Sequence, residues 1–318
     1  MKCKICGNSE NNAVYHPREM MMGLRDVFTY FQCSSCQCLQ IAEFPDNISK
    51  YYTGSYYTRR ENDTPHPIIR YLKQIRNKYA VFNQSLLGKF LYSKYPKVNL
   101  RSLSHLSLKK GMAILDVGCG RGGLLRSLQQ LGFTDLTGID PFNEEKELKI
   151  GRGISLYNKN IDEMQGQWDL IMMHHAFEHM SNPLDVLRNV SRLLSGTGQC
   201  LMRIPVTRSL AWRTFRENWV QLDPPRHFFI HSPKSIRHLI EKTDFNLKKK
   251  VYDSTAFQFW GSIQYENDIP MQDERSYAEN PEESIFSRQD IRMFAKRAKT
   301  LNQQQQGDQA VFILEKEN

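Results

Sequence analysis

Four cysteines near the start of this 318-residue chain have the spacing of metal ligands. They form two C-x-x-C pairs, Cys3 with Cys6 and Cys33 with Cys36. Each pair can hold one side of an ion through a tight turn, and four thiolates complete the tetrahedral coordination of Zn²⁺. We therefore expect a structural zinc site with no open position for a substrate. Cys38 could replace Cys36 as a ligand, and reduced cysteines without a metal are the competing interpretation.

A glycine-dense turn is the second group of residues that could do chemistry. Gly118, Gly120 and Gly122 follow an apolar run and precede a helical pattern. Glycines permit positive φ and a close ligand, and the order strand, turn, helix is that of a nucleotide-type cofactor site. Asp140 ends the next predicted strand and can accept ribose hydroxyls, either of NAD or of an adenosine ligand. Asp116, just before the turn, disfavours a pyrophosphate and favours a cationic group such as a sulfonium.

The histidines are candidates for moving a proton. His227 follows two prolines that stiffen its loop, and an imidazole suits proton removal from an acceptor hydroxyl or carbon near neutral pH. Glu178 with His179 is a second candidate pair, and Tyr56, in the tyrosine-rich segment 51–57, is a third candidate. Structural roles compete with each: His227 bonded to a backbone carbonyl, Glu178 with His179 fixing a loop, and tyrosines packing at a domain junction.

Alternating strands and helices must position these groups. The apolar pattern predicts strands at 112–117, 135–139, 154–158, 169–174 and 199–204, with helices at 122–131, 143–149 and 183–194. Such alternation is typical of parallel βαβ units with right-handed crossovers. A helix at 233–242 and strands at 246–252 and 310–314 follow, and helical spacing at 68–108 predicts a cover for the sheet.

The stretch Asp-Val-Gly-Cys-Gly-Arg-Gly at 116–122 resembles motif I of the class I S-adenosylmethionine-dependent methyltransferases. The resemblance covers about 111–253 and the last strand, and it implies an α/β fold with a doubly wound, seven-stranded Rossmann-like sheet. It also implies S-adenosylmethionine as cofactor, with the 118–122 loop at the methionine part and Asp140 on the ribose. By the same resemblance Asp162 contacts the adenine amino group, Ile161 contacts the ring, and His174 lies where the methionine pocket is completed.

The chain is predicted to contain a zinc-ribbon-like module at 1–50, a tyrosine-rich junction with helical cover at 51–110, and a methyltransferase domain at 111–318. Within that domain, the polar segment 255–308 is interpreted as an insertion. The cysteine module joined to this core resembles bacterial enzymes that include deoxysugar methyltransferases. That resemblance implies a zinc module and aromatic residues that cover a small-metabolite substrate, with sugars, nucleotide-sugars and glycan precursors as candidate acceptors. With the histidines as proton acceptors, we expect His-assisted O- or C-methylation.

Charge and hydropathy limit the classes of substrate and partner that we expect for this chain. The net charge is +9, but the basic residues are dispersed, so we interpret them chiefly as a solvated surface, with an anionic small acceptor as the alternative and nucleic acid disfavoured. An RNA-directed methyltransferase and a non-catalytic binding module remain alternatives. No apolar run reaches the roughly 18 residues of a membrane span, and the first residues do not resemble a signal peptide, so we expect a cytoplasmic protein. The sequence carries no indication of an oligomeric state.

Overall fold

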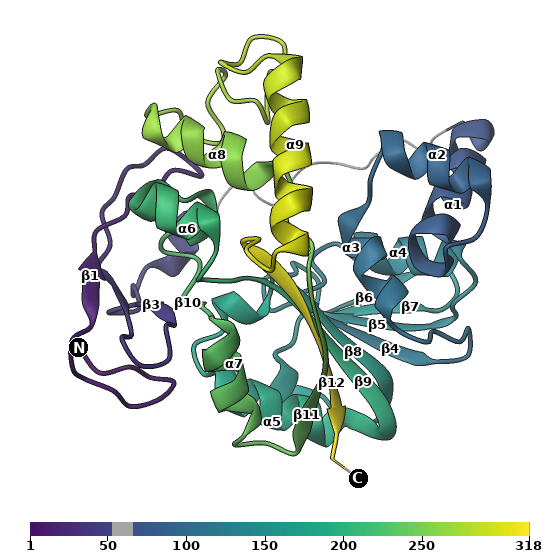
Figure 1. Cartoon of the computed structure of the whole chain (residues 1–318). Helices are drawn as coiled ribbons and strands as arrows, with labels where there is room; N and C mark the ends of the chain where they lie inside the picture. Colours follow the sequence, from purple (N-terminus) through teal and green to yellow (C-terminus); the bar gives the residue numbers. More distant parts are fainter. Residues whose placement is uncertain (53–65, 318) are drawn as a thin grey trace. The chain divides into compact units, whose positions relative to one another are not determined.

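The computed structural model describes residues 1–52 and 66–317 (Figure 1). The chain divides into two compact units. We call the first the cysteine unit; it comprises Met1–Tyr52, His175–Leu187 and Arg203–Phe312. The second, the sheet unit, takes its described residues from Thr53–His174, Arg188–Met202 and Ile313–Asn318.

The sheet unit is built on parallel strands, of which the two central ones are mostly apolar. These parallel strands are β4 (Ala113–Val117), β5 (Asp135–Ile139), β7 (Ile154–Tyr157) and β8 (Trp168–His174). β4 pairs in parallel with both β5 and β8, and β5 pairs in parallel with β7. Buried apolar runs such as Ile114 and Leu115 on β4 are typical of parallel strands covered on both faces. Because parallel strands share one direction, the carboxyl ends of β4 and β5 meet at one edge of the sheet.

The complete sheet has the strand order β11-β12-β9-β8-β4-β5-β7-β6. β11 (Phe245–Tyr252) and β12 (Gln309–Lys316) are neighbours, as predicted, and β9 (Leu194–Pro205) separates β12 from β8. The predicted α/β fold with a Rossmann-like sheet is therefore confirmed. Among the described residues the sheet has one strand more than the seven predicted, namely β6 (Glu147–Ile150) at its edge.

The predicted helix at 143–149 is wrong, because β6 occupies part of this segment. β6 pairs antiparallel with β7, from Glu147 opposite Tyr157 to Ile150 opposite Ile154. Two glycines between the strands take positive φ, +57° at Gly151 and +97° at Gly153. Backbone of this kind closes a tight hairpin, so the glycines of the turn decide the structure here against the helical spacing.

Helices of the sheet unit include the segment predicted as a cover. They are α1 (Pro67–Phe82), α2 (Leu86–Lys94), α3 (Val98–Ser102), η3 (Leu103–His105), α4 (Gly123–Gln130) and η4 (Ile161–Glu163). α1 begins with Pro67 in its first turn, where the missing N–H costs nothing, and ends at Asn83 in the left-handed conformation. α5 (Pro183–Leu193) precedes β9 and has residues in both units.

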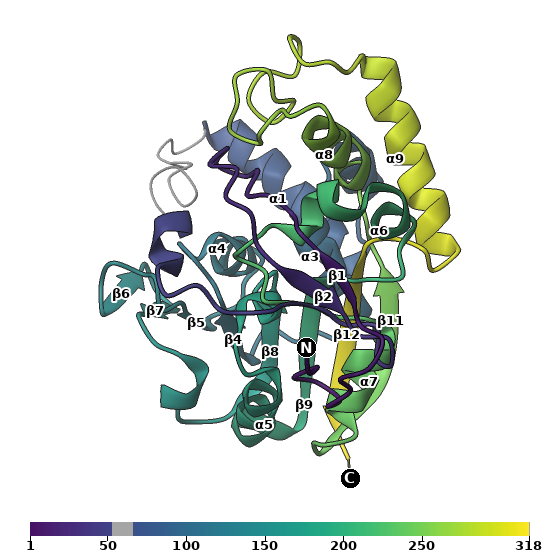
Figure 2. The same cartoon turned by 90° about the vertical axis from the view of Figure 1, so that its left-hand side faces the viewer.

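A four-stranded antiparallel sheet, in the order β1-β2-β3-β10, forms one side of the cysteine unit (Figure 2). β1 (Ala13–Tyr15), β2 (Tyr30–Gln32) and β3 (Leu39–Ile41) come from the N-terminal segment, whereas β10 (Phe229–Ile230) follows His227. β10 pairs with β3, Phe229 opposite Gln40 and Ile230 opposite Leu39. The loop that carries His227 is thus tied by backbone pairing to the cysteine-bearing segment.

The core of the cysteine unit is aromatic and includes Trp212, Trp219 and Phe259. Its remaining elements are η1 (Ile48–Tyr52), η5 (Phe177–His179), α6 (Leu210–Phe215), η6 (Arg216–Asn218), η7 (Val220–Leu222), α7 (Pro233–Ile240), α8 (Phe257–Glu266) and α9 (Arg288–Gln303). α8 and α9 come from the polar segment 255–308, and each buries apolar residues in this core, such as Phe294 of α9. The segment therefore supports the core with two helices.

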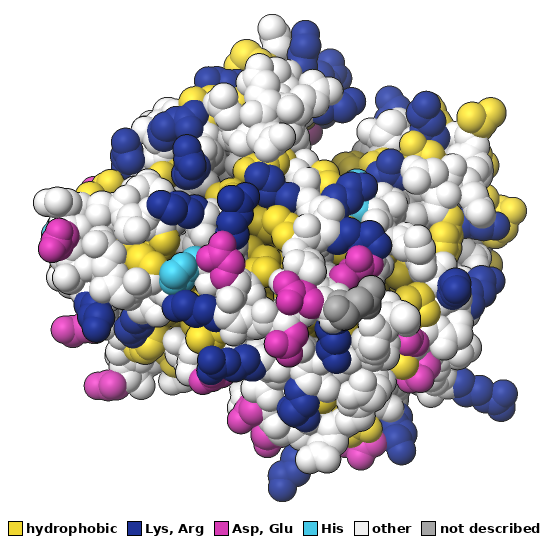
Figure 3. Space-filling view, turned by 60° about the horizontal axis from the view of Figure 1, so that its bottom comes forward, with side chains coloured by type: hydrophobic (Ala, Val, Ile, Leu, Met, Phe, Trp, Pro, Cys, Tyr) yellow, Lys and Arg dark blue, Asp and Glu magenta, His cyan; other side chains and the backbone are white. Residues whose placement is uncertain are grey.

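Surface charge is dispersed on the face seen in Figure 3, where Lys and Arg side chains lie among acidic and apolar ones. In the part of the chain that the structure describes, no helix combines the length and apolarity needed to cross a membrane.

Candidate functional site

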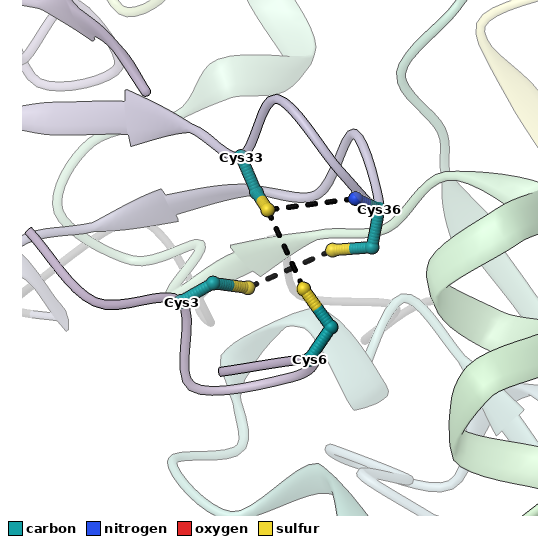
Figure 4. A group of neighbouring side chains, drawn as sticks. All are labelled: Cys3, Cys6, Cys33 and Cys36. Carbon is teal, nitrogen blue, oxygen red and sulfur yellow. Dashed lines mark hydrogen bonds between the residues drawn. The ribbon is translucent and has the colours of Figure 1, made fainter. Parts of the chain in front are cut away.

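Four sulfur atoms converge in the cysteine unit (Figure 4). Cys3 Sγ lies 3.6 Å from Cys36 Sγ, and Cys6 Sγ lies 3.5 Å from Cys33 Sγ. A tetrahedral Zn²⁺ with Zn–S bonds of about 2.3 Å requires sulfur atoms about 3.8 Å apart, so the cluster fits this ion. Cys38 is buried and stands outside the group of four.

Both cysteine pairs are shaped by the same backbone turn. The Gly7 N–H donates to the Cys3 carbonyl, and the Gln37 N–H donates to the Cys33 carbonyl, at 2.9 Å each. Gly7 and Gln37 each follow the second cysteine of a pair, and each has positive φ, +80° and +64°. The turn directs both sulfur atoms of a pair inward, which is why the C-x-x-C spacing predicts the cluster.

The glycine turn after β4 has the backbone that its sequence requires. Gly118, Gly120 and Gly122 have φ of +75°, +48° and +74°. The Asp140 carboxylate accepts the Gly120 N–H at 3.0 Å through Oδ2 and the Phe142 N–H at 2.9 Å through Oδ1. A side chain at Gly120 would meet open space, so a ligand can approach the turn there. The arrangement fits an adenosine-type cofactor, because the fixed carboxylate keeps lone pairs for ribose hydroxyls.

Asp116 lies on β4, opposite Gly138 of β5, and its side chain is buried. Burial, and then the charge of Asp140, raises the pKa of Asp116 to about 8. The carboxyl therefore keeps a proton at neutral pH unless a cation compensates its charge. This differs from the simple negative charge that the sequence suggested.

The residues expected at the adenine lie in η4, directly after β7. Ile161 is buried and Asp162 is exposed, and a capping box formed by Asn160 and Glu163 fixes this turn. His174 ends β8, and its Nε2 lies 2.9 Å from the Ser102 hydroxyl of α3. Turns at the carboxyl ends of β7 and β8 thus position the expected cofactor residues.

In the cysteine unit, Glu178, His179 and His227 bring three potential ligand atoms within 4.8 Å of one another. Glu178 and His179 belong to η5, and His227 comes from the loop before β10. The two imidazole rings meet edge to face, with centroids 4.7 Å apart. The structure therefore brings together three of the four residues predicted to be catalytic. The fourth, Tyr56, lies outside the described residues.

The protons on both imidazoles are fixed by backbone carbonyls. His227 Nδ1 lies 2.8 Å from the Gln221 carbonyl. His179 Nδ1 lies 2.9 Å from the Arg226 carbonyl and 3.2 Å from the Tyr52 hydroxyl, which can accept from the same N–H. A carbonyl only accepts, so each Nδ1 carries a proton, and in the neutral imidazole the Nε2 atom keeps its lone pair. The contact expected of a structural histidine thus occupies one nitrogen of His227 and leaves the other available.

Glu178 is fully buried, yet it is held as a carboxylate. Its Oε1 lies 3.2 Å from His175 Nδ1. Burial opposes ionisation of Glu178, but the hydrogen bond from His175 and the charges of nearby histidines outweigh it and lower its pKa to about 2. Burial, together with His227, lowers the pKa of His179 to about 4, so that His179 is neutral at pH 7. The cluster therefore combines one negative charge with a neutral imidazole.

Comparison with known proteins places the chain in a family. A sequence model described as a methyltransferase domain matches residues 91–250. The chain belongs to this methyltransferase family. The predicted membership of the class I S-adenosylmethionine-dependent methyltransferases is confirmed.

The relatives of this methyltransferase match it over part of their length. The ubiquinone biosynthesis O-methyltransferase of Pseudomonas paraeruginosa is 31% identical over 102 residues, which cover 29% of this chain and 44% of that protein. The protein of the same name from Bordetella avium is 34% identical over 101 residues, covering 28% of this chain and 41% of that one. The chain thus spans less than half the length of these relatives.

Solved structures similar to this methyltransferase include the cyclopropane synthase MmaA2 from Mycobacterium tuberculosis. It has a TM-score of 0.46 at 17% identity and covers 80% of this chain and 99% of its own. Coclaurine N-methyltransferase, bound to N-methylheliamine and SAH, has a TM-score of 0.44 at 15% identity and covers 79% of both chains.

Sequence reasoning missed the residues that hold the histidine loop of this methyltransferase. Arg226 is fully buried, and its guanidinium donates to Asp223 Oδ1 at 2.5 Å and to Glu19 Oε1 at 2.8 Å. Arg203 donates at 2.7 Å to His175 Nε2, and Asp253 accepts from Arg203 at 2.6 Å. For the contacts of Arg226, the one signal in the sequence was its position beside His227. For the contacts of Arg203 the sequence contained no signal.

Proposed function

We propose that this protein transfers a methyl group from S-adenosylmethionine to an oxygen or carbon of a small metabolite. The observation that carries the proposal is the glycine turn whose own backbone clamps Asp140 beside the open space at Gly120. Family membership supports it, and the name of the ubiquinone biosynthesis O-methyltransferases supports an oxygen acceptor. The cofactor would supply an activated methyl group, and the protein would supply position and proton removal.

Each cofactor contact is proposed from the residue's place in the fold. Asp140 would bind the ribose, Asp162 and Ile161 would bind the adenine, and the turn from Gly118 to Gly122 would line the methionine part. His174 would complete this part from the end of β8. Asp116 would stabilise the positive charge of the ligand once its own proton has left.

Activation of the acceptor would fall to the cluster of Glu178, His179 and His227. In the protein as it stands, Nε2 of His227 is the atom that can accept a proton, because Nδ1 already donates to Gln221. Glu178 would stabilise the imidazolium that forms. Tyr56 remains a predicted contributor.

The four clustered cysteines would bind one structural Zn²⁺. Sugars, nucleotide-sugars and glycan precursors, including anionic ones, are the proposed acceptors, and a cytoplasmic location remains our prediction. The RNA-directed alternative requires affinity for RNA that falls steeply with salt.

The deciding experiment is a screen of these acceptors for methyl transfer, measured as a gain in mass. Asp140→Ala should abolish binding of S-adenosylmethionine in calorimetry, whereas exposed Asp135→Asn should leave it intact. His227→Ala should keep cofactor affinity and lose turnover. Unchanged cofactor binding by the Asp140 variant would contradict the proposed site.

A further inference from the structure

The Glu178, His179 and His227 cluster contains three electron-pair donors with no hydrogen-bond donor between them. In the neutral imidazoles both Nε2 atoms carry lone pairs, since both Nδ1 atoms donate to carbonyls. Glu178 Oε2 is buried and finds no hydrogen-bond partner among the residues that the structure describes. A buried carboxylate oxygen without a partner bears its desolvation penalty uncompensated, and this penalty is larger for charged groups than for neutral ones. The cluster therefore lacks a positive group.

The neighbouring arginine side chains are already bound to other acceptors. Arg226 lies between Asp223 and Glu19 and also donates to the Tyr51 carbonyl at 3.0 Å. The guanidinium of Arg203 is bound by Asp253 and His175. Neither can supply the charge, whereas an external cation can.

We propose that Glu178, His179 and His227 bind a divalent transition-metal cation through the carboxylate and the two Nε2 atoms. Two imidazoles with one carboxylate are a donor set for Zn²⁺, Fe²⁺ or Co²⁺. His227 Nε2 now lies 4.0 Å from Glu178 Oε1. Metal bonds of about 2.1 Å in a tetrahedral site place ligand atoms about 3.4 Å apart, so a small side-chain rotation closes the site.

The groups that would orient the ligands of such a site are already present. Histidine ligands of metals usually donate their other N–H to a carbonyl or carboxylate, which fixes the tautomer and the ring. His179 does this to Arg226 and His227 does it to Gln221. His175 holds the Glu178 carboxylate in the same way. Each of the three ligands thus has an orienting partner.

Three protein ligands leave coordination positions open, and this consequence rests on the proposed function. An acceptor hydroxyl that binds the cation has a lowered pKa and releases its proton to solvent. His227 then acts as a ligand instead of as the base. The cation and the structural zinc would differ in their ligands, nitrogen and oxygen against sulfur.

The test uses the full chain loaded with one equivalent of Zn²⁺ and titrated with Co²⁺, without cofactor or acceptor. We expect one equivalent of Co²⁺ to bind in calorimetry, with visible absorption that lacks thiolate-to-cobalt charge transfer. His227→Gln and Glu178→Gln should each weaken this binding by at least about 100-fold, while His238→Gln on α7 should not. No binding, thiolate charge transfer, or binding unchanged in both cluster variants would overturn the proposal.

A second measurement avoids dependence on variants that fail to fold. X-ray absorption at the cobalt edge of the wild-type complex should show only nitrogen and oxygen ligands, with the scattering signature of two imidazoles. Sulfur among the atoms bound to cobalt, or the absence of imidazole from them, would exclude the site. Because neither measurement uses S-adenosylmethionine, a negative result leaves the proposed methyl transfer, with His227 as base, intact.

Discussion

Replacing Asp116 by asparagine should stabilise the protein without cofactor and weaken cofactor binding. Asp116 is 4% exposed on β4, and burial together with Asp140 raises its pKa from 3.8 to about 8. Between these two pH values the folded chain keeps a proton that the unfolded chain has lost. The contribution of Asp116 to the free energy of unfolding is therefore at its maximum below about pH 4. It is lost as the pH rises through the pKa of the folded state.

The size of this effect follows from the shift. At pH 7 the loss extends over about three pH units at about 1.4 kcal/mol each, which gives an upper limit of about 4 kcal/mol. The Asp116→Asn variant would have no such loss, because an amide does not titrate in this range. Its gain over wild type should thus be largest at pH 7 to 8 and vanish near pH 4.

Urea unfolding at pH 5 and pH 8 measures the difference, with exposed Asp135→Asn as the matched control. A variant no more stable than wild type at pH 8 would refute the buried, proton-bearing Asp116.

The pH dependence of cofactor binding tests the same protonation of Asp116 in the opposite direction. Wild-type affinity for S-adenosylmethionine should rise by up to about tenfold per pH unit between pH 6 and 8, because only the ionised carboxyl attracts the cationic ligand. Asp116→Asn should show a flat profile.

Two further substitutions test the cysteine unit. Arg226→Met leaves Glu19 and Asp223 buried without their partner and should lower the free energy of unfolding by about 3–5 kcal/mol in urea, whereas exposed Arg275→Met should change it little. A loss below about 1 kcal/mol would contradict the importance of the buried pairs. Cys33→Ser should lose bound zinc in elemental analysis and melt at a lower temperature, while Cys38→Ser should retain zinc. Equal zinc content in both variants would show that the ligand set is wrong.

The residues of the cofactor site could be predicted from the sequence because the patterns that indicate them are local. Gly118, Gly120 and Gly122 are glycines at positions of positive φ, and the carboxyl end of β5 places Asp140 against the same turn. The helix predicted at 143–149 from residue spacing is wrong, because the glycines that close the β6–β7 hairpin outweigh this spacing. Local patterns also could not reveal that Asp116 keeps its proton, since burial on β4 is set by the packed sheet.

The surroundings of the histidines could not be predicted, because they join distant parts of the chain. Glu19 and Arg226 are separated by 207 positions, and Asp253 reaches Arg203 across 50. No periodicity links such pairs. His227 itself was identifiable from its proline-stiffened loop, but the choice of Nε2 as its available atom required the Gln221 carbonyl at Nδ1.

These contacts give the cysteine module a role that differs from covering a substrate. The module holds the histidine loop at three points within the cysteine unit: β3 pairs with β10, Glu19 binds Arg226, and the Tyr30 hydroxyl donates at 2.8 Å to the His227 carbonyl. Tyr30 and Arg226 are fully buried, so the loop cannot shift without exposing or unpairing them. A zinc ion that rigidifies the segment from Cys33 to Cys36, next to β3, would therefore stabilise the position of His227 without touching a substrate.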